Sequence, residues 1–226
     1  MLQKFAIAMV SSLCVSAIAD IAYARPEQKS PEDLEIDRQI INSSPVLRRW
    51  LNNPPDLLED IYHTPSFEPK LQIGMTSRNH SLGLEVGVED VFVGRSPLTL
   101  NANLQTEFSG RESEVQAGIR YYLLPLGSYW NIAPIAGYRQ FNQYERPQIS
   151  GLDVGLQGIL ILSPRSSDLR LSHTFTSPYS NLELSKTVLS TSYAVTRQMR
   201  LGTKIEWRRS PLIYDSRVGF LVEISF

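Results

Sequence analysis

The sequence predicts an all-β fold, an antiparallel up-and-down transmembrane β-barrel of about ten strands that follows a short helical segment. Three observations predict it. Large apolar residues recur at every second position from Lys70 to Phe226, which is the side-chain period of a β-strand. The alternation falls into ten runs that turn-forming residues separate. The polar positions between the apolar ones carry acids and bases in similar numbers.

Residues 1–24 are predicted to be a secretory signal peptide. Lys4 precedes an apolar run, and Ala22-Tyr23-Ala24 fits the small-residue cleavage site. The run is too short to span a bilayer, which requires about 20 residues. We expect Sec-dependent export and cleavage near Ala24, with a cut after Ala19 as the alternative. The single cysteine, Cys14, lies in this segment, so the mature chain has no thiol for a disulfide.

Residues 25–68 are predicted to form a helical periplasmic segment. Proline stands where three helices would begin, in Ser30-Pro31, Ser44-Pro45 and Pro54-Pro55, and a serine can cap the first two. Helices this short are not stable alone in water. We therefore expect the segment to dock on another surface, and a plug for the barrel is one such role.

Residues 69–226 are predicted to form the barrel. An even number of antiparallel strands closes a barrel without leaving an edge, as a bilayer requires. The fifth run contains Pro134, which cannot donate a hydrogen bond to a neighbouring strand and fits poorly there. The apolar positions of the ten runs begin at Leu71, Leu82, Leu98, Val115, Trp130, Leu152, Leu169, Leu189, Leu201 and Val218.

Periodicity alone does not say whether the apolar face meets lipid or a soluble core. If the chain enters from the periplasm, the connections after even-numbered runs are short turns. The longest connections, FNQYERPQIS and RRSPLIYDS, then lie on the other side, as in outer-membrane barrels. A soluble secreted β-domain that binds a ligand is the alternative. Two aromatic girdles also favour lipid; they consist of Phe92, Tyr121, Trp130, Tyr193 and Phe226 at one end and Phe108, Tyr138, Phe175 and Trp207 at the other.

The polar face is predicted to fill the inside of the barrel with ion pairs. Ten strands enclose a narrow tube with room for side chains and little water. Acids and bases nearly balance along this face, which favours a paired network over a selective pore. The predicted lumen network consists of Glu85, Glu107, Glu114, Arg120, Arg139, Asp153, Arg170, Arg200, Lys204, Glu206, Arg217 and Glu223.

The signal peptide, the alternating strands and the final strand RVGFLVEISF together resemble bacterial outer-membrane β-barrel proteins. The resemblance covers about residues 70–226 and implies a mature chain in the outer membrane, in contact with its lipid. It also implies a partner, the barrel-assembly machinery, which would read Phe220, Val222, Ile224 and Phe226 as its signal. The stretches VLRRWLNNPPDLLEDI, GVEDVFVGR and RYYLLPLG are similar to uncharacterised secreted proteins of cyanobacteria, a likeness that implies no activity.

The sequence favours a non-enzymatic role, either structural or as a contact surface through loops 142–150 and 208–216. A cell-wall or surface partner of unknown identity fits the second role. A small pore that residues 25–68 gate or plug is the alternative. A net charge of −1 gives no electrostatic footprint for nucleic acid.

An outer-membrane protease or lipid hydrolase is a third, weaker hypothesis. Ser172 and His173 could supply a nucleophile and a base, but neighbours in a strand point to opposite faces. His80 could reach Glu112 or Glu114 at the outer end of the barrel. The three histidines have no ligand spacing and the mature chain has no cysteine, so we expect neither a metal nor a cofactor.

Overall fold

The computed structural model describes residues 40, 43–52, 61–78, 81–211 and 214–226. The chain divides into two compact units, Met1–Pro55 and Asp56–Phe226. The predicted signal peptide, residues 1–24, and the helices predicted to begin at Pro31 and Pro55 lie outside the described residues. No helix in the described part of the chain is long and apolar enough to cross a membrane, a finding that concerns helices only.

The first unit contains helix α3, Pro45–Asn52, which begins at one of the predicted starts. Ser44 caps it, because its side-chain oxygen accepts a hydrogen bond from the Leu47 amide at 3.3 Å. The Ser44 carbonyl accepts a second one from the Arg48 amide. Pro45 suits the first helical position, where an amide would have no partner inside the helix.

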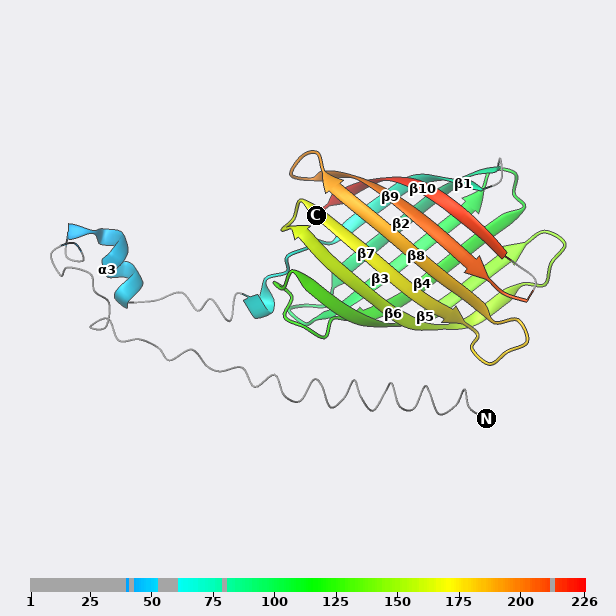
Figure 1. Cartoon of the computed structure of the whole chain (residues 1–226), viewed down its shortest axis with the longest axis horizontal. Coiled ribbons are helices and arrows are strands. Elements are labelled where there is room, and N and C mark those ends of the chain that lie inside the picture. Colours follow the sequence, from blue (N-terminus) through cyan, green and yellow to red (C-terminus); the bar gives the residue numbers. More distant parts are fainter. Residues whose placement is uncertain (1–39, 41–42, 53–60, 79–80, 212–213) are drawn as a thin grey trace. The chain divides into compact units, whose positions relative to one another are not determined.

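The second unit is a closed antiparallel barrel of ten strands, as predicted (Figure 1). Each strand pairs with its neighbours in sequence, and β1 pairs with β10 from Lys70 opposite Ser225 to Ser77 opposite Val218. Residues 61–63 form a helical turn before the first strand. The strands are β1 (Lys70–Arg78), β2 (Ser81–Phe92), β3 (Leu98–Glu107), β4 (Glu112–Tyr121), β5 (Trp130–Gln143), β6 (Ile149–Ser163), β7 (Ser167–Thr176), β8 (Leu184–Ala194), β9 (Met199–Arg209) and β10 (Tyr214–Ser225).

The two faces of the wall have opposite chemistry, as β9 illustrates. Its inward side chains include Arg200, Lys204, Glu206 and Arg208, and its outward ones include Leu201, Ile205 and Trp207. A soluble protein would hide the apolar face and expose the charged one, so the soluble alternative is wrong. A closed wall with an apolar exterior suits a bilayer, because lipid offers no hydrogen bonds to a strand edge.

Pro134 fits the sheet better than its sequence context suggests. The pairing of β4 with β5 ends at Arg120 opposite Ile135, so Pro134 lies just beyond that ladder and needs no amide hydrogen on that side. On the other side it stands opposite Leu156 of β6. The proline thus interrupts the pairing with the β4 side, and the Leu123 amide resumes it by donating to the Ile132 carbonyl at 3.0 Å.

The predicted difference in loop length is wrong. β5 continues to Gln143 and β6 begins at Ile149, which leaves 144–148 as their connection, and β9 and β10 are joined by 210–213. The longest connection is instead 122–129, after β4. For the connection of β5 to β6 the reason is apolar packing, because Phe141, Ile149 and Leu184 form a buried cluster inside the wall and extend these two strands.

Candidate functional site

The candidate site is the charged lumen of the barrel. We call the end that holds Lys70 and Phe226 the floor, and the opposite end the rim. All twelve residues predicted for the lumen lie inside the wall, and each forms at least one ion pair there. The paired carboxylates inside the described barrel are Glu85, Glu89, Asp90, Glu107, Glu112, Glu114, Asp153, Asp168, Glu206, Asp215 and Glu223. The paired cations are Lys70, Arg78, Arg120, Arg139, Arg170, Lys186, Arg200, Lys204, Arg208 and Arg217.

Several members of this network were not predicted from the sequence. Lys70, Glu112 and Lys186 lie on the inward face of their strands, in keeping with the two-residue period. They precede the first apolar residue of each predicted run. Continuing the two-residue period toward the strand ends would have found them. Arg78 and Asp215 sit at strand ends in the same way. Asp90 departs from the two-residue period, and a β-bulge explains why its side chain reaches the lumen.

Arg208 is the centre of the rim half of the network. Its Nη1 donates to Glu112 Oε1 at 2.6 Å, and its Nη2 donates to Gln105 Oε1 at 2.7 Å and Glu206 Oε2 at 3.0 Å. The guanidinium also lies over the ring of Phe141, 5.2 Å from its centroid. Strands β3, β4 and β9 are therefore tied together across the lumen.

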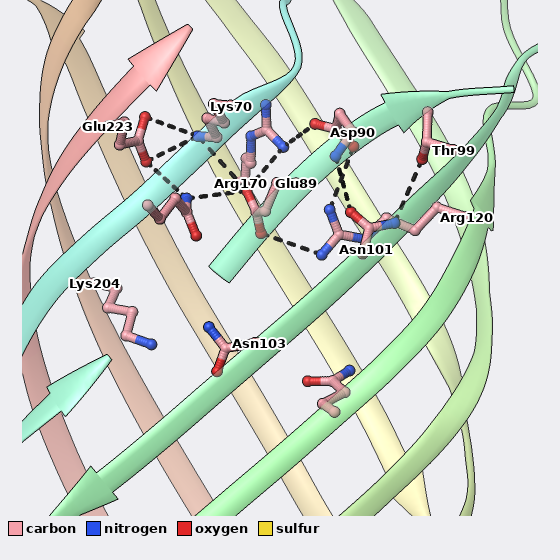
Figure 2. A network of polar contacts seen from close by, with 12 residues as sticks. Lys70, Glu89, Asp90, Thr99, Asn101, Asn103, Arg120, Arg170, Lys204 and Glu223 are labelled. Atoms are coloured by element: carbon pink, nitrogen blue, oxygen red, sulfur yellow. Dashed lines mark hydrogen bonds and ion pairs between the residues drawn. The ribbon is translucent and has the colours of Figure 1, made fainter. Parts of the chain in front are cut away.

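A β-bulge in β2 builds the floor half of the network. The register with β3 shifts between Val88 and Val91, and Asp90 adopts a positive φ of 57°. The extra residue turns both Glu89 and Asp90 into the lumen. There they bind Arg120, while Asp90 also accepts a hydrogen bond from Arg170 (Figure 2).

Tyr122 completes the contacts of Asp90 at the floor. Its hydroxyl donates to Asp90 Oδ1 at 2.7 Å. Burial, together with the negative charge of Asp90, raises the pKa of Tyr122 well above its usual value of 10.0. The phenol therefore keeps its proton and remains a hydrogen-bond donor.

The bulge also explains why the prediction that Phe92 belongs to an outer aromatic girdle is wrong. Because the faces reverse after Asp90, Phe92 points inward and packs against the buried Phe67, with ring centroids 5.7 Å apart. The other eight predicted girdle residues are exposed on the outside of the wall or at its ends: Tyr121, Trp130, Tyr193, Phe226, Phe108, Tyr138, Phe175 and Trp207.

The residues before β1 close the floor. Phe67 is 4% exposed and lies between Tyr122, at 4.8 Å between ring centroids, and Arg170, whose guanidinium carbon is 5.7 Å from the ring centre. The Ser66 amide donates to the Leu126 carbonyl at 3.0 Å, and the Gly127 amide donates to the Ile61 carbonyl at 2.8 Å. Residues 61–68 are the described part of the predicted helical segment that belongs to the second unit, and they form a cap on the floor.

A cavity of about 90 Å³ remains inside the network, between its two halves. Gln72, Asn101 and Asn103 line it together with charged side chains of both halves. This volume accommodates a few water molecules and no solute of the size of a sugar.

Ser172 and His173, the predicted nucleophile and base, lie on opposite faces of the wall. Ser172 lines the cavity, whereas His173 is exposed on the outer face, where its Nδ1 lies 2.7 Å from Thr187 Oγ1. His63 is exposed in the helical turn before the barrel, and His80 lies outside the described residues. Across the described residues, no group of three or more His, Cys, Asp or Glu side chains is placed to hold a metal ion.

The residues predicted as the assembly signal all point away from the lumen. Phe220, Val222, Ile224 and Phe226 are exposed along the outer face of β10 and at its end. Their role in recognition stays a prediction.

No protein-family model and no curated protein matches the chain. A KdgM porin is similar in structure, with 9% identity and a TM-score of 0.44 over 70% of this chain and 99% of that chain. A NanC porin has 9% identity and a TM-score of 0.43 over 70% and 98%. A chain described as "De novo design of transmembrane beta-barrels" has 10% identity and a TM-score of 0.40 over 72% and 98%. The likeness to these outer-membrane-type barrels is one of fold alone.

Proposed function

We propose that the chain is a non-enzymatic outer-membrane barrel with a closed, charge-filled lumen, whose role is structural or that of a contact surface. One observation carries the proposal: ion pairs cross the lumen, and the cavity between them measures about 90 Å³. A hydrated ion would have to break several buried pairs to pass. In this proposal the floor faces the periplasm, the signal peptide is removed near Ala24, and the assembly machinery inserts the barrel.

The rim offers the contact surface. Each of the three hairpins whose tips are fully described carries an exposed aromatic residue, namely Phe108, Tyr144 or Tyr179, and the exposed Tyr214 begins β10 at the same end. Tyr179 is 98% exposed and has a positive φ of 68°, and its amide donates to Glu183 Oε2 at 3.0 Å. Because its own loop holds Tyr179 in a strained conformation, the side chain is preorganised and loses little freedom on binding. This suits contact with a cell-wall or surface partner.

A small pore that the N-terminal segment caps is the second candidate. The seating of Phe67 against Tyr122 and Arg170 favours it, because a removable stopper needs such a socket. The ion pairs behind the cap argue for the closed barrel, since removing the cap leaves them in place.

Ion conductance in a planar bilayer separates the two candidates. We would compare the refolded mature chain with a Phe67→Ala variant, after gel mobility has shown that both are folded and inserted. We expect no channels from either. Channels from Phe67→Ala alone would establish the capped pore, and channels from both would overturn the closed barrel.

A further inference from the structure

More cations than carboxylates line the cavity inside the barrel. Five cations line it, those of Arg120, Arg139, Arg170, Lys186 and Lys204. Three carboxylates line it, those of Glu85, Glu89 and Glu206. The remaining partners of these cations, among them Asp153 and Asp168, do not line the cavity. An occupant therefore meets more cations than anions, although acids slightly outnumber bases in the network as a whole.

The lining also carries hydrogen-bond donors that no protein atom satisfies. Gln157 Nε2, Arg139 Nε and Arg120 Nε have no acceptor, and Gln157 and Arg139 are 3% and 1% exposed. Arg139 Nη1 also lacks a hydrogen bond, but it lies 3.6 Å from Glu114 Oε1 in an ion pair. Burying an N–H group without an acceptor is unfavourable, so such groups in native proteins point to an occupant that accepts. One lining oxygen, Glu85 Oε2, also lacks a hydrogen bond, but Lys204 pairs with it.

We propose that this cavity is a binding site for a small inorganic anion of the halide class, with chloride as the physiological ion. A halide accepts hydrogen bonds from several donors at once, and cations outnumber carboxylates among the side chains that it would meet. Water satisfies the same donors but carries no charge to interact with the lining cations, and it brings hydrogen atoms that need acceptors of their own. The volume of about 90 Å³ fits a halide with one or two waters. The site does not depend on whether the barrel conducts.

Bromide diffraction tests the site directly. Crystals of the refolded mature chain, grown with bromide as the only halide, would be measured at the bromine absorption edge. We expect an anomalous peak within hydrogen-bond distance of Arg139 and Gln157. A cavity that holds only water, with no anomalous peak, would overturn the proposal.

Thermal unfolding tests the same site in solution. Ligand that binds only the folded state raises Tm with the logarithm of its concentration. We expect Tm to rise by several degrees between 1 mM and 300 mM chloride, with gluconate, which is too large for the cavity, keeping the ionic strength constant. An equal Tm at both chloride concentrations would count against halide binding.

Two glutamines provide a matched pair of variants. Gln157→Glu replaces the unpaired donor with a carboxylate inside the cavity, and we expect it to abolish the chloride-dependent rise in Tm. Gln105 also has an unpaired, buried Nε2, but it does not line the cavity, so Gln105→Glu should keep the rise. If Gln157→Glu does not fold, Gln157→Met removes the donor without adding charge. Equal responses from the Gln157 and Gln105 variants would refute the assignment.

Discussion

Arg208 is fully buried and charged, so its place in the lumen depends on the acceptors around its guanidinium group. Taking an ion out of water costs several kcal/mol, and attraction to its partners offsets that cost only when the geometry is good. Removing one partner is therefore more destabilising than replacing all of the paired residues with apolar ones, because the remaining charges stay buried with less compensation. Glu112 and Glu206 both pair with Arg208, and each shares its charge with other cations as well.

Arg208→Met should lower the free energy of unfolding by about 3–5 kcal/mol, because it takes one buried cation away from three buried carboxylates, those of Glu112, Glu114 and Glu206. Arg209 is the matched control: it is the next residue of β9, and it is exposed on the outer face. Arg209→Met should change stability by about 0.5 kcal/mol or less. Urea titration of the refolded proteins in detergent measures both values. Equal losses would contradict the view that the lumen network stabilises the barrel.

At the scale of elements, the bulge in β2 decides which side chains reach the floor. Its cost is a left-handed backbone at Asp90, which aspartate and asparagine tolerate better than residues that cannot hydrogen-bond locally. The Asp90 amide also donates to Asn101 Oδ1 at 3.0 Å, so the bulged backbone is satisfied by a side chain of β3. The strain is therefore offset by contacts that a regular strand could not form.

Substitutions at Asp90 separate the backbone effect from the charge. Asp90→Asn keeps the tolerance for positive φ and removes the charge, whereas Asp90→Ala loses both. We expect alanine to be less stable than asparagine by about 1–2 kcal/mol from the backbone alone, in addition to any lost hydrogen bonds. Asp168, which pairs with Arg170 from a regular strand, is the control. Chemical unfolding should show a larger difference in stability between the asparagine and alanine variants of Asp90 than between those of Asp168. An equal difference at both sites would argue against backbone strain at Asp90.

The cap is a second element with a testable consequence. Phe67→Ala removes the ring that fills the space between Phe92 and Tyr122, and such core truncations cost about 3–5 kcal/mol when the whole fold depends on them. Here we expect local release: protease should cut within residues 61–69 while the barrel stays resistant. Phe108→Ala, an exposed residue near the rim, should leave the cleavage pattern unchanged. Resistance of residues 61–69 in both variants would show that Phe67 does not anchor the cap.

At the scale of the whole molecule, a narrow barrel crowds its inner face. A Cβ atom on Gly137 would lie 2.4 Å from the Ala117 carbonyl oxygen, and one on Gly155 would lie 2.1 Å from the His173 carbonyl oxygen. Both contacts are with the backbone of the adjacent strand, so no side-chain movement relieves them. Glycines on the inner face thus let the sheet curve tightly around its charged contents.

The architecture could be read from the sequence because a two-residue period is local and persists along each strand. The exceptions have local physical causes. Nothing in the sequence GVEDVF marks the extra residue of the bulge, so the inward turn of Asp90 and Phe92 was missed. The polar stretch after Phe141 resembled a long loop, because only the folded barrel brings Phe141, Ile149 and Leu184 together.

The outer face of the barrel carries the last prediction, which concerns assembly in the cell. Phe226 and Tyr193 are similarly exposed aromatic residues at the floor, at 69% and 66%, but only Phe226 belongs to the predicted assembly signal. Phe226→Ser should sharply reduce the amount of folded barrel in the outer membrane, whereas Tyr193→Ser should have little effect. Both variants should refold equally well in detergent, because neither residue is packed in the lumen. Heat-dependent gel mobility of membrane fractions and of refolded protein measures the two quantities. A loss in the cell that is equal for both variants would mean that any floor aromatic suffices, and that the lipid boundary rather than recognition explains the position of Phe226.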